Sequence, residues 1–232
     1  MKTVVMLPTY EEAGNIGPLI EGLYGLGVPG LDVLVMDDRS PDGTAKEAAG
    51  LKARFPGLRV VERSGPAGRG LAGREGFLRA LEAGADLVVE MDADLSHQPS
   101  QVPRLLEAMA ECDVAIGSRM TSGGEDRRSA PRRALTGLSA AYARLLLGLD
   151  VRDANSGFRC FRRSALEAIE PAALRSQGPS IVHEVLFRAA RRGLRIREVP
   201  IEFAPRGSGR SKLDLPRLAA GWLWILRLRL GL

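Results

Sequence analysis

Short apolar runs alternate with longer segments of helical period through the first 118 residues of this 232-residue chain. The runs predict strands at residues 3–7, 31–36, 58–61, 87–91 and 114–117. Between the first two runs, apolar residues recur at helical spacing: Ile16, Leu19, Ile20, Leu23 and Leu26. A strand, a crossover helix and a second strand make a βαβ unit. We therefore expect an α/β fold with a mostly parallel sheet flanked by helices.

The rest of the chain continues with helical segments and fewer strands. The patterns predict helices at residues 42–54, 99–111, 132–149, 163–169 and 181–192, and strands at 157–161 and 196–203. The Gly-, Ser- and Arg-rich stretch from Thr121 to Ala130 has no periodicity, so we expect a mobile loop there. Since no linker divides the chain, residues 1–212 are expected to form one domain with halves at 1–118 and 119–212.

The two halves of the chain differ strongly in charge. The net charge is +5 overall, but residues 1–118 carry −7 and residues 119–232 carry +12. Almost all the basic residues are arginines, whose planar guanidinium groups suit phosphate oxygens. A basic half of this kind fits nucleic acid, an anionic membrane surface or a phosphorylated substrate, and the charge alone does not choose among them.

Cysteine usage and the two ends of the chain bear on its location. Cys112 and Cys160 fit no metal or redox spacing, so we expect reduced core residues in a cytosolic protein. The apolar run after Met1 is too short for a signal peptide. Residues 213–232 are rich in leucine, contain both tryptophans and are interrupted by arginines. This segment is too short and too charged to span a bilayer, and it is expected either to lie amphipathically at a membrane surface or to pack on the core.

Two carboxylates follow the fourth predicted strand, in the sequence Asp92-Ala93-Asp94. At this spacing both can reach one divalent cation in the crevice where α/β sheets bind ligands. A cation there would neutralise the charge on a departing diphosphate. We predict that Asp92 and Asp94 bind a metal, although a solvated pair of loop carboxylates has the same pattern.

Polar residues also follow the first two predicted strands. The first ends at Pro8 and continues through Tyr10 and Glu11, and the second ends in the acidic pair Asp37 and Asp38. Each group alone is typical of a helix cap or a turn. Because the carboxyl ends of parallel strands share one edge of the sheet, the groups together favour a nucleotide-sugar site.

The segment from Gly68 to Gly73 matches GxGxxG, the pattern of dinucleotide-binding loops. That pattern belongs in the turn after the first strand, and this turn, residues 9–15, contains only Gly14. We therefore reject a dinucleotide site. The glycines are better explained by close approach to a donor phosphate or by close packing of a helix.

The basic half contains arginines suited to hold phosphate groups: Arg119, Arg132, Arg133 and the segment from Arg206 to Lys212. Each of them is equally well explained as a solvated arginine in an arginine-rich chain. A phosphomonoester acceptor is already anionic near neutral pH, so it needs positioning more than a general base. His97 and His183 are accordingly not required as bases, although His97 lies close enough to the DAD motif to touch the site.

The motifs together resemble those of the dolichol-phosphate (polyprenyl-phosphate) mannose synthases, which are family 2 glycosyltransferases. The resemblance covers nearly the whole chain and is carried by PTYEEAGNI (8–16), DDRSPDGT (37–44), MDADLSHQP (91–99), GSR (117–119), the arginines at 132 and 133, DANSGFRCFRR (153–163) and RGSGRSKL (206–213). It implies a GT-A fold with a nucleotide-sugar half at 1–118 and an acceptor half at 119–212. It also implies inverting transfer of mannose from GDP-mannose to a polyprenyl (dolichyl) phosphate, with Mg²⁺ or Mn²⁺ as cofactor.

Residue roles follow from the same resemblance. It assigns the metal to Asp92 and Asp94, the donor nucleotide to Pro8, Tyr10, Glu11, Asp38 and Asp92, the phosphates to Arg119, Arg132, Arg133, Arg206 and Lys212, and catalysis to Asp92, Asp94 and Arg119. The chain departs from the family at Ser96, where many relatives have a glutamine, and within 206–212, where an aromatic residue is replaced. We expect peripheral attachment at the cytoplasmic face of a membrane, by residues 213–232 or through a membrane-protein partner.

Other functions are compatible with some of these features. A related polyprenyl-phosphate enzyme that uses UDP-glucose would share the motifs. A sugar-1-phosphate nucleotidyltransferase would need a Gly-rich basic loop after the first strand, where residues 9–15 are acidic. A non-enzymatic RNA-binding or membrane-scaffold protein would use only the basic half, and we expect no nucleic-acid partner.

Overall fold

A central, mostly parallel β-sheet organises the computed structural model, which describes residues 1–205, 207 and 215–231. Among these residues the strand order is β3-β2-β1-β4-β7-β5-β8. The bounds are β1 Thr3–Thr9, β2 Leu31–Asp37, β3 Leu58–Glu62, β4 Leu87–Glu90, β5 Val114–Ser118, β7 Arg159–Arg162 and β8 Ile196–Pro200. Strand β7 runs antiparallel to β4 and β5, and the other neighbours are parallel. The predicted fold class is confirmed.

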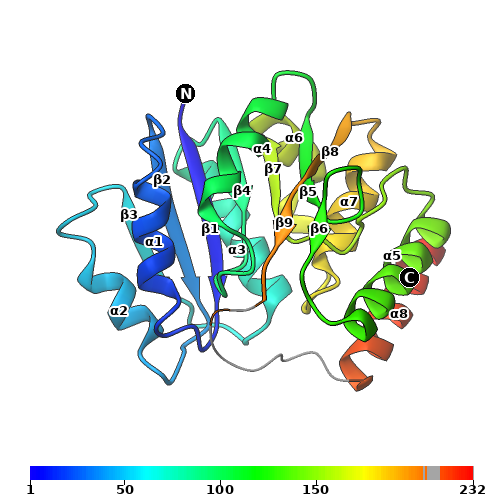
Figure 1. The fold of residues 1–232 in the computed structure, drawn as a ribbon, viewed down its shortest axis with the longest axis horizontal. Helices are drawn as coiled ribbons and strands as arrows, with labels where there is room; N and C mark the ends of the chain where they lie inside the picture. Colours follow the sequence, from blue (N-terminus) through cyan, green and yellow to red (C-terminus); the bar gives the residue numbers. More distant parts are fainter. Residues whose placement is uncertain (206, 208–214, 232) are drawn as a thin grey trace.

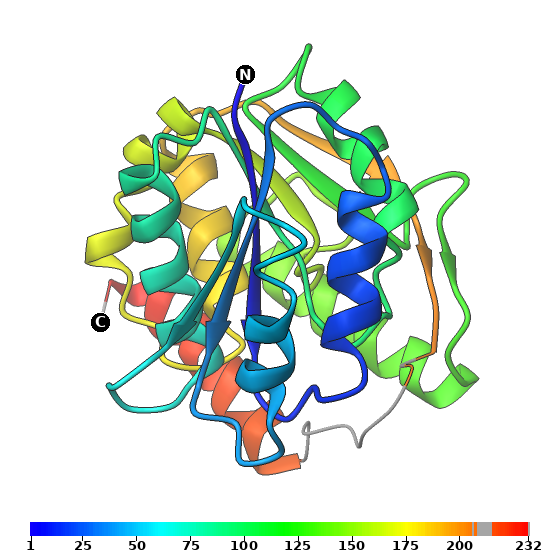
Figure 2. The ribbon, with the colours of Figure 1, turned by 90° about the vertical axis from the view of Figure 1, so that its left-hand side faces the viewer.

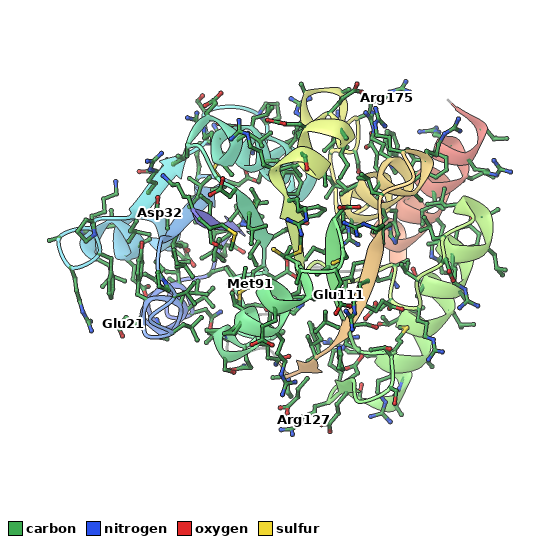
Figure 3. All side chains as sticks on the ribbon, turned by 90° about the horizontal axis from the view of Figure 1, so that it is seen from above. Glu21, Asp32, Met91, Glu111, Arg127 and Arg175 are labelled. Atoms are coloured by element: carbon green, nitrogen blue, oxygen red, sulfur yellow. The ribbon has the colours of Figure 1, made fainter. Side chains whose placement is uncertain are left out.

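Helices cover both faces of the sheet (Figures 1 and 2). On one face lie α1 (Ile16–Tyr24), α2 (Thr44–Gly50) and α4 (Val102–Ala108), with the 3₁₀ turn η1 (Pro99–Gln101); on the other lie α3 (Arg69–Glu82), α6 (Arg163–Ile169) and α7 (Ile181–Arg191), with η2 (Pro171–Ala173). Alternate residues of β1 supply the two cores, since Val5 and Leu7 pack on the α1 side and Val4 and Met6 on the α3 side. Seen from above, Met91 lies at the centre of the molecule, whereas Glu21, Arg127 and Arg175 lie at its periphery (Figure 3).

The glycines of segment 68–73 allow a loop to pack against the start of α3. A Cβ atom on Gly70 would lie 2.2 Å from the carbonyl oxygen of Ser176, and one on Gly68 would lie 2.5 Å from that of Gln177. The amide of Gly70 donates a 2.9 Å hydrogen bond to the Gln177 carbonyl. Close packing, one of the two explanations offered for this motif, is therefore what the structure contains.

The stretch from Thr121 to Ala130 is not a loop throughout, which corrects the sequence prediction. Strand β6 (Glu125–Asp126) pairs in parallel with β9 (Glu202–Phe203). The partner strand lies far away in the sequence, so local periodicity carried no signal for it. Cys112 and Cys160 are free and buried, as predicted.

The C-terminal helix α8 (Leu215–Leu230) packs on α5 (Ala130–Leu147) and α7. Ile225 is fully buried, and the indole of Trp222 donates to the Ser139 hydroxyl at 3.3 Å. Both helices carry exposed leucines: Leu138 and Leu145 on α5, and Leu223, Leu226 and Leu230 on α8. Within the ranges that the structure describes, no helix combines the length and apolar character needed to cross a bilayer. Packing on the core is thus observed, and membrane contact stays a prediction.

Candidate functional site

A cavity of about 940 Å³ lies at the carboxyl ends of β1, β2 and β4. It brings together five of the predicted site residues: Pro8, Tyr10, Asp38, Asp92 and Asp94. Glu11 is exposed beside it, and the neighbouring Glu12 belongs to the lining. The prediction that polar strand ends share one crevice is therefore confirmed in its geometry, while the individual roles stay predictions.

The turn after β1 is held against the start of α2 by side-chain acceptors. The amides of Ala13 and Gly14 donate to the carboxylates of Asp42 (3.0 Å) and Glu47 (2.8 Å). Asp42 also accepts from the hydroxyl of Thr44 at 2.6 Å. Burial acts to raise the pKa of Asp42, but these hydrogen bonds outweigh it and lower the pKa. The carboxylates of Asp42 and Glu47 thus fix the turn that follows Tyr10 in the cavity wall.

Asp38 is buried in the cavity wall with both oxygens engaged. One oxygen forms an ion pair with Arg63, and the other accepts the amide of Gly68 at 2.8 Å. Arg63 also bonds Glu75 at 3.0 Å. These contacts connect the end of β2 to the start of α3, so Asp38 braces the wall in addition to facing the cavity.

The DAD motif follows β4 directly, and its two carboxylates differ in exposure. The side chain of Asp92 is 40% exposed, whereas Asp94 is 6% exposed and accepts the amide of Ser96 at 3.0 Å. Leu95 has φ +62°, a left-handed conformation that non-glycine residues adopt rarely and that is frequent at functional sites. Both carboxylates line the cavity.

His97 stabilises the DAD loop through a hydrogen bond to its backbone. Its Nδ1 accepts the backbone amide of Asp92 at 3.3 Å, and its ring lies 5.0 Å from Phe158 and 5.1 Å from Phe203. Burial lowers the pKa of His97, which favours the neutral ring that this bond requires. The loop also meets the segment after β9, because the amides of Ala204 and Gly207 donate to the Ser96 and Asp94 carbonyls, both at 3.0 Å.

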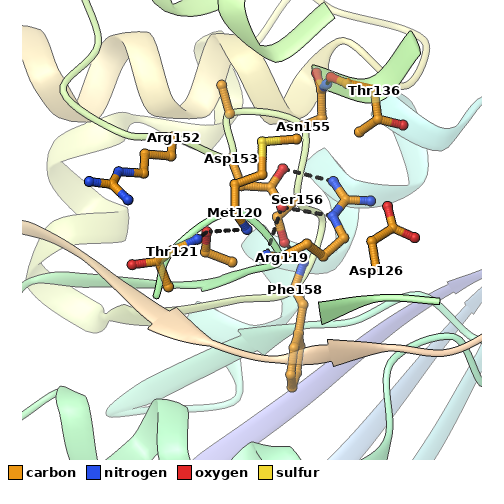
Figure 4. A network of polar contacts seen from close by, with 12 residues as sticks. Arg119, Met120, Thr121, Asp126, Thr136, Arg152, Asp153, Asn155, Ser156 and Phe158 are labelled. Carbon is orange, nitrogen blue, oxygen red and sulfur yellow. Dashed lines mark hydrogen bonds and ion pairs between the residues drawn. The ribbon is translucent and has the colours of Figure 1, made fainter. Parts of the chain in front are cut away.

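Arg119 is paired inside the protein (Figure 4). Its guanidinium makes two 2.7 Å bonds to the carboxylate of Asp153, which also accepts the Arg119 amide at 3.0 Å. The Arg119 side chain is 7% exposed, and its guanidinium carbon lies 4.9 Å from the ring centre of Phe203. The described cavity lining does not contain Arg119, whose proposed phosphate contact stays a prediction.

The other predicted phosphate ligands lie elsewhere. Arg132 and Arg133 are exposed in the first turn of α5, and Arg206 and Lys212 lie outside the described residues. The cationic side chains that the described cavity lining does contain are Arg69, Arg175 and Arg227. Sequence reasoning missed all three; the one available signal was an arginine inside the Gly-rich segment 68–73.

His183 makes contacts that connect two helices of the fold. Its Nε2 lies 2.8 Å from the Asn155 amide oxygen, and the Asn155 amide nitrogen donates to the Thr136 carbonyl at 2.9 Å. Burial, together with the nearby positive charge of Arg159, lowers the pKa of His183 to about 3. The pairing connects the first turn of α7 with α5.

The neutral state of His183 predicts a loss of stability in mild acid. The unfolded chain takes up the proton near its ordinary pKa of about 6.5, whereas the folded protein resists it down to about 3. Stability from this group is therefore complete above pH 6.5 and falls below it, by at most about 1.4 kcal/mol per pH unit. Urea unfolding between pH 7.5 and 5 measures this slope. His183→Gln is expected to flatten it, and an unchanged slope in the variant would contradict the assignment.

Comparison with known proteins identifies the family of the chain. Residues 4–170 match the model of glycosyl transferase family 2. The chain therefore belongs to family 2 of the glycosyltransferases and is an enzyme of that class.

Two individual relatives are similar to the chain over most of its length. The chain is 42% identical to an undecaprenyl-phosphate mannosyltransferase of Micrococcus luteus, with both chains fully covered. It is 41% identical to a polyprenol monophosphomannose synthase of Mycolicibacterium smegmatis, over 92% of this chain and 81% of the relative. Among solved structures, a glucosyl-3-phosphoglycerate synthase of Mycobacterium tuberculosis in complex with Mn²⁺ and UDP has a TM-score of 0.72 at 21% identity, covering 100% of this chain and 80% of the other. This last likeness establishes a GT-A-like fold.

Proposed function

We propose that the chain transfers mannose from GDP-mannose to a polyprenyl (dolichyl) phosphate, with inversion at the sugar. The observation that carries this is the cavity in which Asp92 and Asp94 of the DAD motif meet the ends of β1 and β2. The relatives named as polyprenyl-phosphate mannosyltransferases support the choice of mannose and of a lipid phosphate.

The side chains of the DAD motif fit a divalent cation. Among the described residues no group of three or more His, Cys, Asp or Glu side chains could enclose a metal. Two carboxylates on a cavity wall suit Mg²⁺ or Mn²⁺, which keep coordination positions for substrate phosphates and water. Such an ion, held by Asp92 and Asp94, would supply charge neutralisation for the diphosphate leaving group. The Mn²⁺ complex of the solved neighbour is consistent with this.

The donor and the acceptor are assigned to different parts of the site. Pro8, Tyr10, Glu11 and Asp38 form the nucleotide side. Arg119, Arg132, Arg133, Arg206 and Lys212 are proposed for phosphate contacts. On the acceptor side, α8 contributes Ala220, Gly221 and Trp224 to the cavity lining, an apolar wall suited to a prenyl chain.

The reaction needs little acid–base chemistry from the protein. A phosphate oxygen of the acceptor forms a bond to the anomeric carbon of mannose while the bond from that carbon to the diphosphate oxygen breaks. GDP leaves with the electron pair, and an α-linked donor gives a β-linked product. Because the nucleophile is already anionic, the side chains act mainly by positioning the two substrates.

The exposed leucines and neighbouring arginines of α5 and α8 are proposed to lie on the cytoplasmic face of a membrane, where the acceptor resides. Apolar side chains flanked by cations suit an anionic interface. A membrane-protein partner that covers the same leucines is the alternative, and flotation of the purified chain with anionic lipid vesicles distinguishes the two.

Donor competition tests the proposed reaction. Purified chain, Mn²⁺ and a short polyprenyl phosphate are incubated with radiolabelled GDP-mannose or with radiolabelled UDP-glucose. We expect labelled lipid from GDP-mannose and none from UDP-glucose. Nuclear magnetic resonance of the anomeric carbon is expected to show a β linkage. Labelled lipid from UDP-glucose alone would keep the family and overturn the donor.

A further inference from the structure

Arg69 is the first residue of α3, and one nitrogen of its guanidinium group contacts two carboxylates. Its Nη2 lies 2.8 Å from Oε1 of Glu90 and 3.3 Å from Oδ1 of Asp92. Its side chain is 21% exposed and lines the cavity. A cation of the protein thus already contacts one of the two carboxylates assigned to the metal.

Glu90 is the stronger partner and keeps Arg69 in place. Its side chain is 1% exposed, and a buried carboxylate is strongly unfavourable without a compensating positive charge. Arg159, fully buried, lies close enough to interact with it, but its guanidinium donates to the carbonyls of Val182 (2.6 Å) and Ala154 (3.2 Å). Among the described residues, Glu90 therefore forms its direct ion pair with Arg69, and the longer contact of Arg69 to Asp92 is the one that can be given up.

Space exists beside the Arg69–Asp92 contact. Gly157 faces it, and a Cβ atom built there would lie 3.4 Å from both carboxylate oxygens of Asp92 and 3.6 Å from Nη2 of Arg69. Since glycine has no side chain, nothing from this position covers the pair. The pair opens to the same cavity that contains Asp94.

We propose that Arg69 exchanges partners during the reaction: it neutralises Asp92 in the metal-free enzyme and contacts the donor diphosphate once Asp92 binds the divalent cation. Glu90 holds its guanidinium beside the DAD motif in both states. This proposal rests on the proposed function, and it makes Arg69 a donor-binding residue.

Two effects of opposite sign follow. Arg69 competes with the metal for Asp92, so its removal is expected to tighten binding of Mn²⁺ alone about tenfold. It also helps bind the diphosphate, so its removal is expected to weaken binding of GDP at saturating Mn²⁺ about tenfold. A purely structural role would weaken both or change neither.

The test measures Mn²⁺ binding by electron paramagnetic resonance without nucleotide, and GDP binding by calorimetry, for wild type and Arg69→Gln. Arg79→Gln is the matched control, because Arg79 lies on the same helix, pairs with Glu75 and is absent from the described lining of this cavity. If Arg69→Gln does not fold, Glu90→Gln is compared with the double variant Arg69→Gln/Glu90→Gln, in which no buried carboxylate loses its partner.

Tighter Mn²⁺ and weaker GDP binding on removal of Arg69, with Arg79→Gln unchanged, is the expected result. Unchanged or weaker Mn²⁺ binding overturns the competition for Asp92, and unchanged GDP binding overturns the diphosphate contact. A wild-type protein that binds no Mn²⁺ would instead overturn the proposed metal site, and this proposal with it.

Discussion

Replacing Asp94 by alanine is expected to lower the rate of mannose transfer by about 10²–10³-fold. Asp94 is buried in the cavity wall, 6% exposed, and is one of the two carboxylates proposed to hold a divalent cation. In the proposed reaction, the negative charge on the departing diphosphate would lose most of its compensation without this carboxylate. Initial rates with radiolabelled GDP-mannose, measured across a Mn²⁺ titration, give the size of the effect.

The matched control for this change is Asp32→Asn. Asp32 lies on β2 and pairs with Lys2 at 3.1 Å, outside the described lining of the cavity, so its removal is expected to leave the rate unchanged. Thermal unfolding separates loss of activity from loss of fold. An Asp94→Ala protein that keeps a rate within a few-fold of wild type would remove Asp94 from the reaction.

Replacing Asp153 by asparagine is expected to lower the free energy of unfolding by about 3 kcal/mol. Asp153 is fully buried and receives two side-chain bonds and one amide bond from Arg119, whose own side chain is 7% exposed. Asparagine keeps the shape but removes the charge, leaving the buried guanidinium without its counter-ion. Urea unfolding at pH 7.5 measures the change.

An exposed pair of the same geometry provides the comparison. Arg195 makes bonds of 3.1 and 2.9 Å to Asp113, but the Arg195 side chain is 64% exposed. Asp113→Asn is therefore expected to change the free energy of unfolding by less than about 1 kcal/mol. Equal effects of the two substitutions would show that burial does not decide the strength of the Arg119 pair.

The sequence predicted most features that depend on neighbouring residues, but not helix α3. The strands of the first 118 residues and helix α6 have local periodicity, and the DAD motif is placed by the end of a single strand. Features that depend on distant partners were not accessible. Nothing near residue 119 reveals that Arg119 pairs with Asp153, and nothing near residues 125–126 reveals that β6 pairs with β9, which lies far along the chain.

The residues of the cavity show the same difference between features set by neighbouring residues and features set by distant ones. The motif alone predicts Asp92 and Asp94 as metal ligands, whereas nothing in the sequence distinguishes Arg69 from the glycines around it. Only the fold brings the first turn of α3 beside Glu90 and Asp92. Arg175 and Arg227 reach the cavity from the loop before α7 and from α8, which no pattern in the sequence connects.

Helix α8 decides where this enzyme can be shortened or tagged. Ala220, Gly221, Trp224 and Arg227 form part of the cavity lining, and Ile225 fills the core between α8 and its neighbours. Shortening the chain at residue 214 to improve solubility would therefore remove part of the cavity wall together with the exposed leucines of α8. Purification tags belong at the amino terminus, where Met1 is 80% exposed and is absent from the described lining of the cavity.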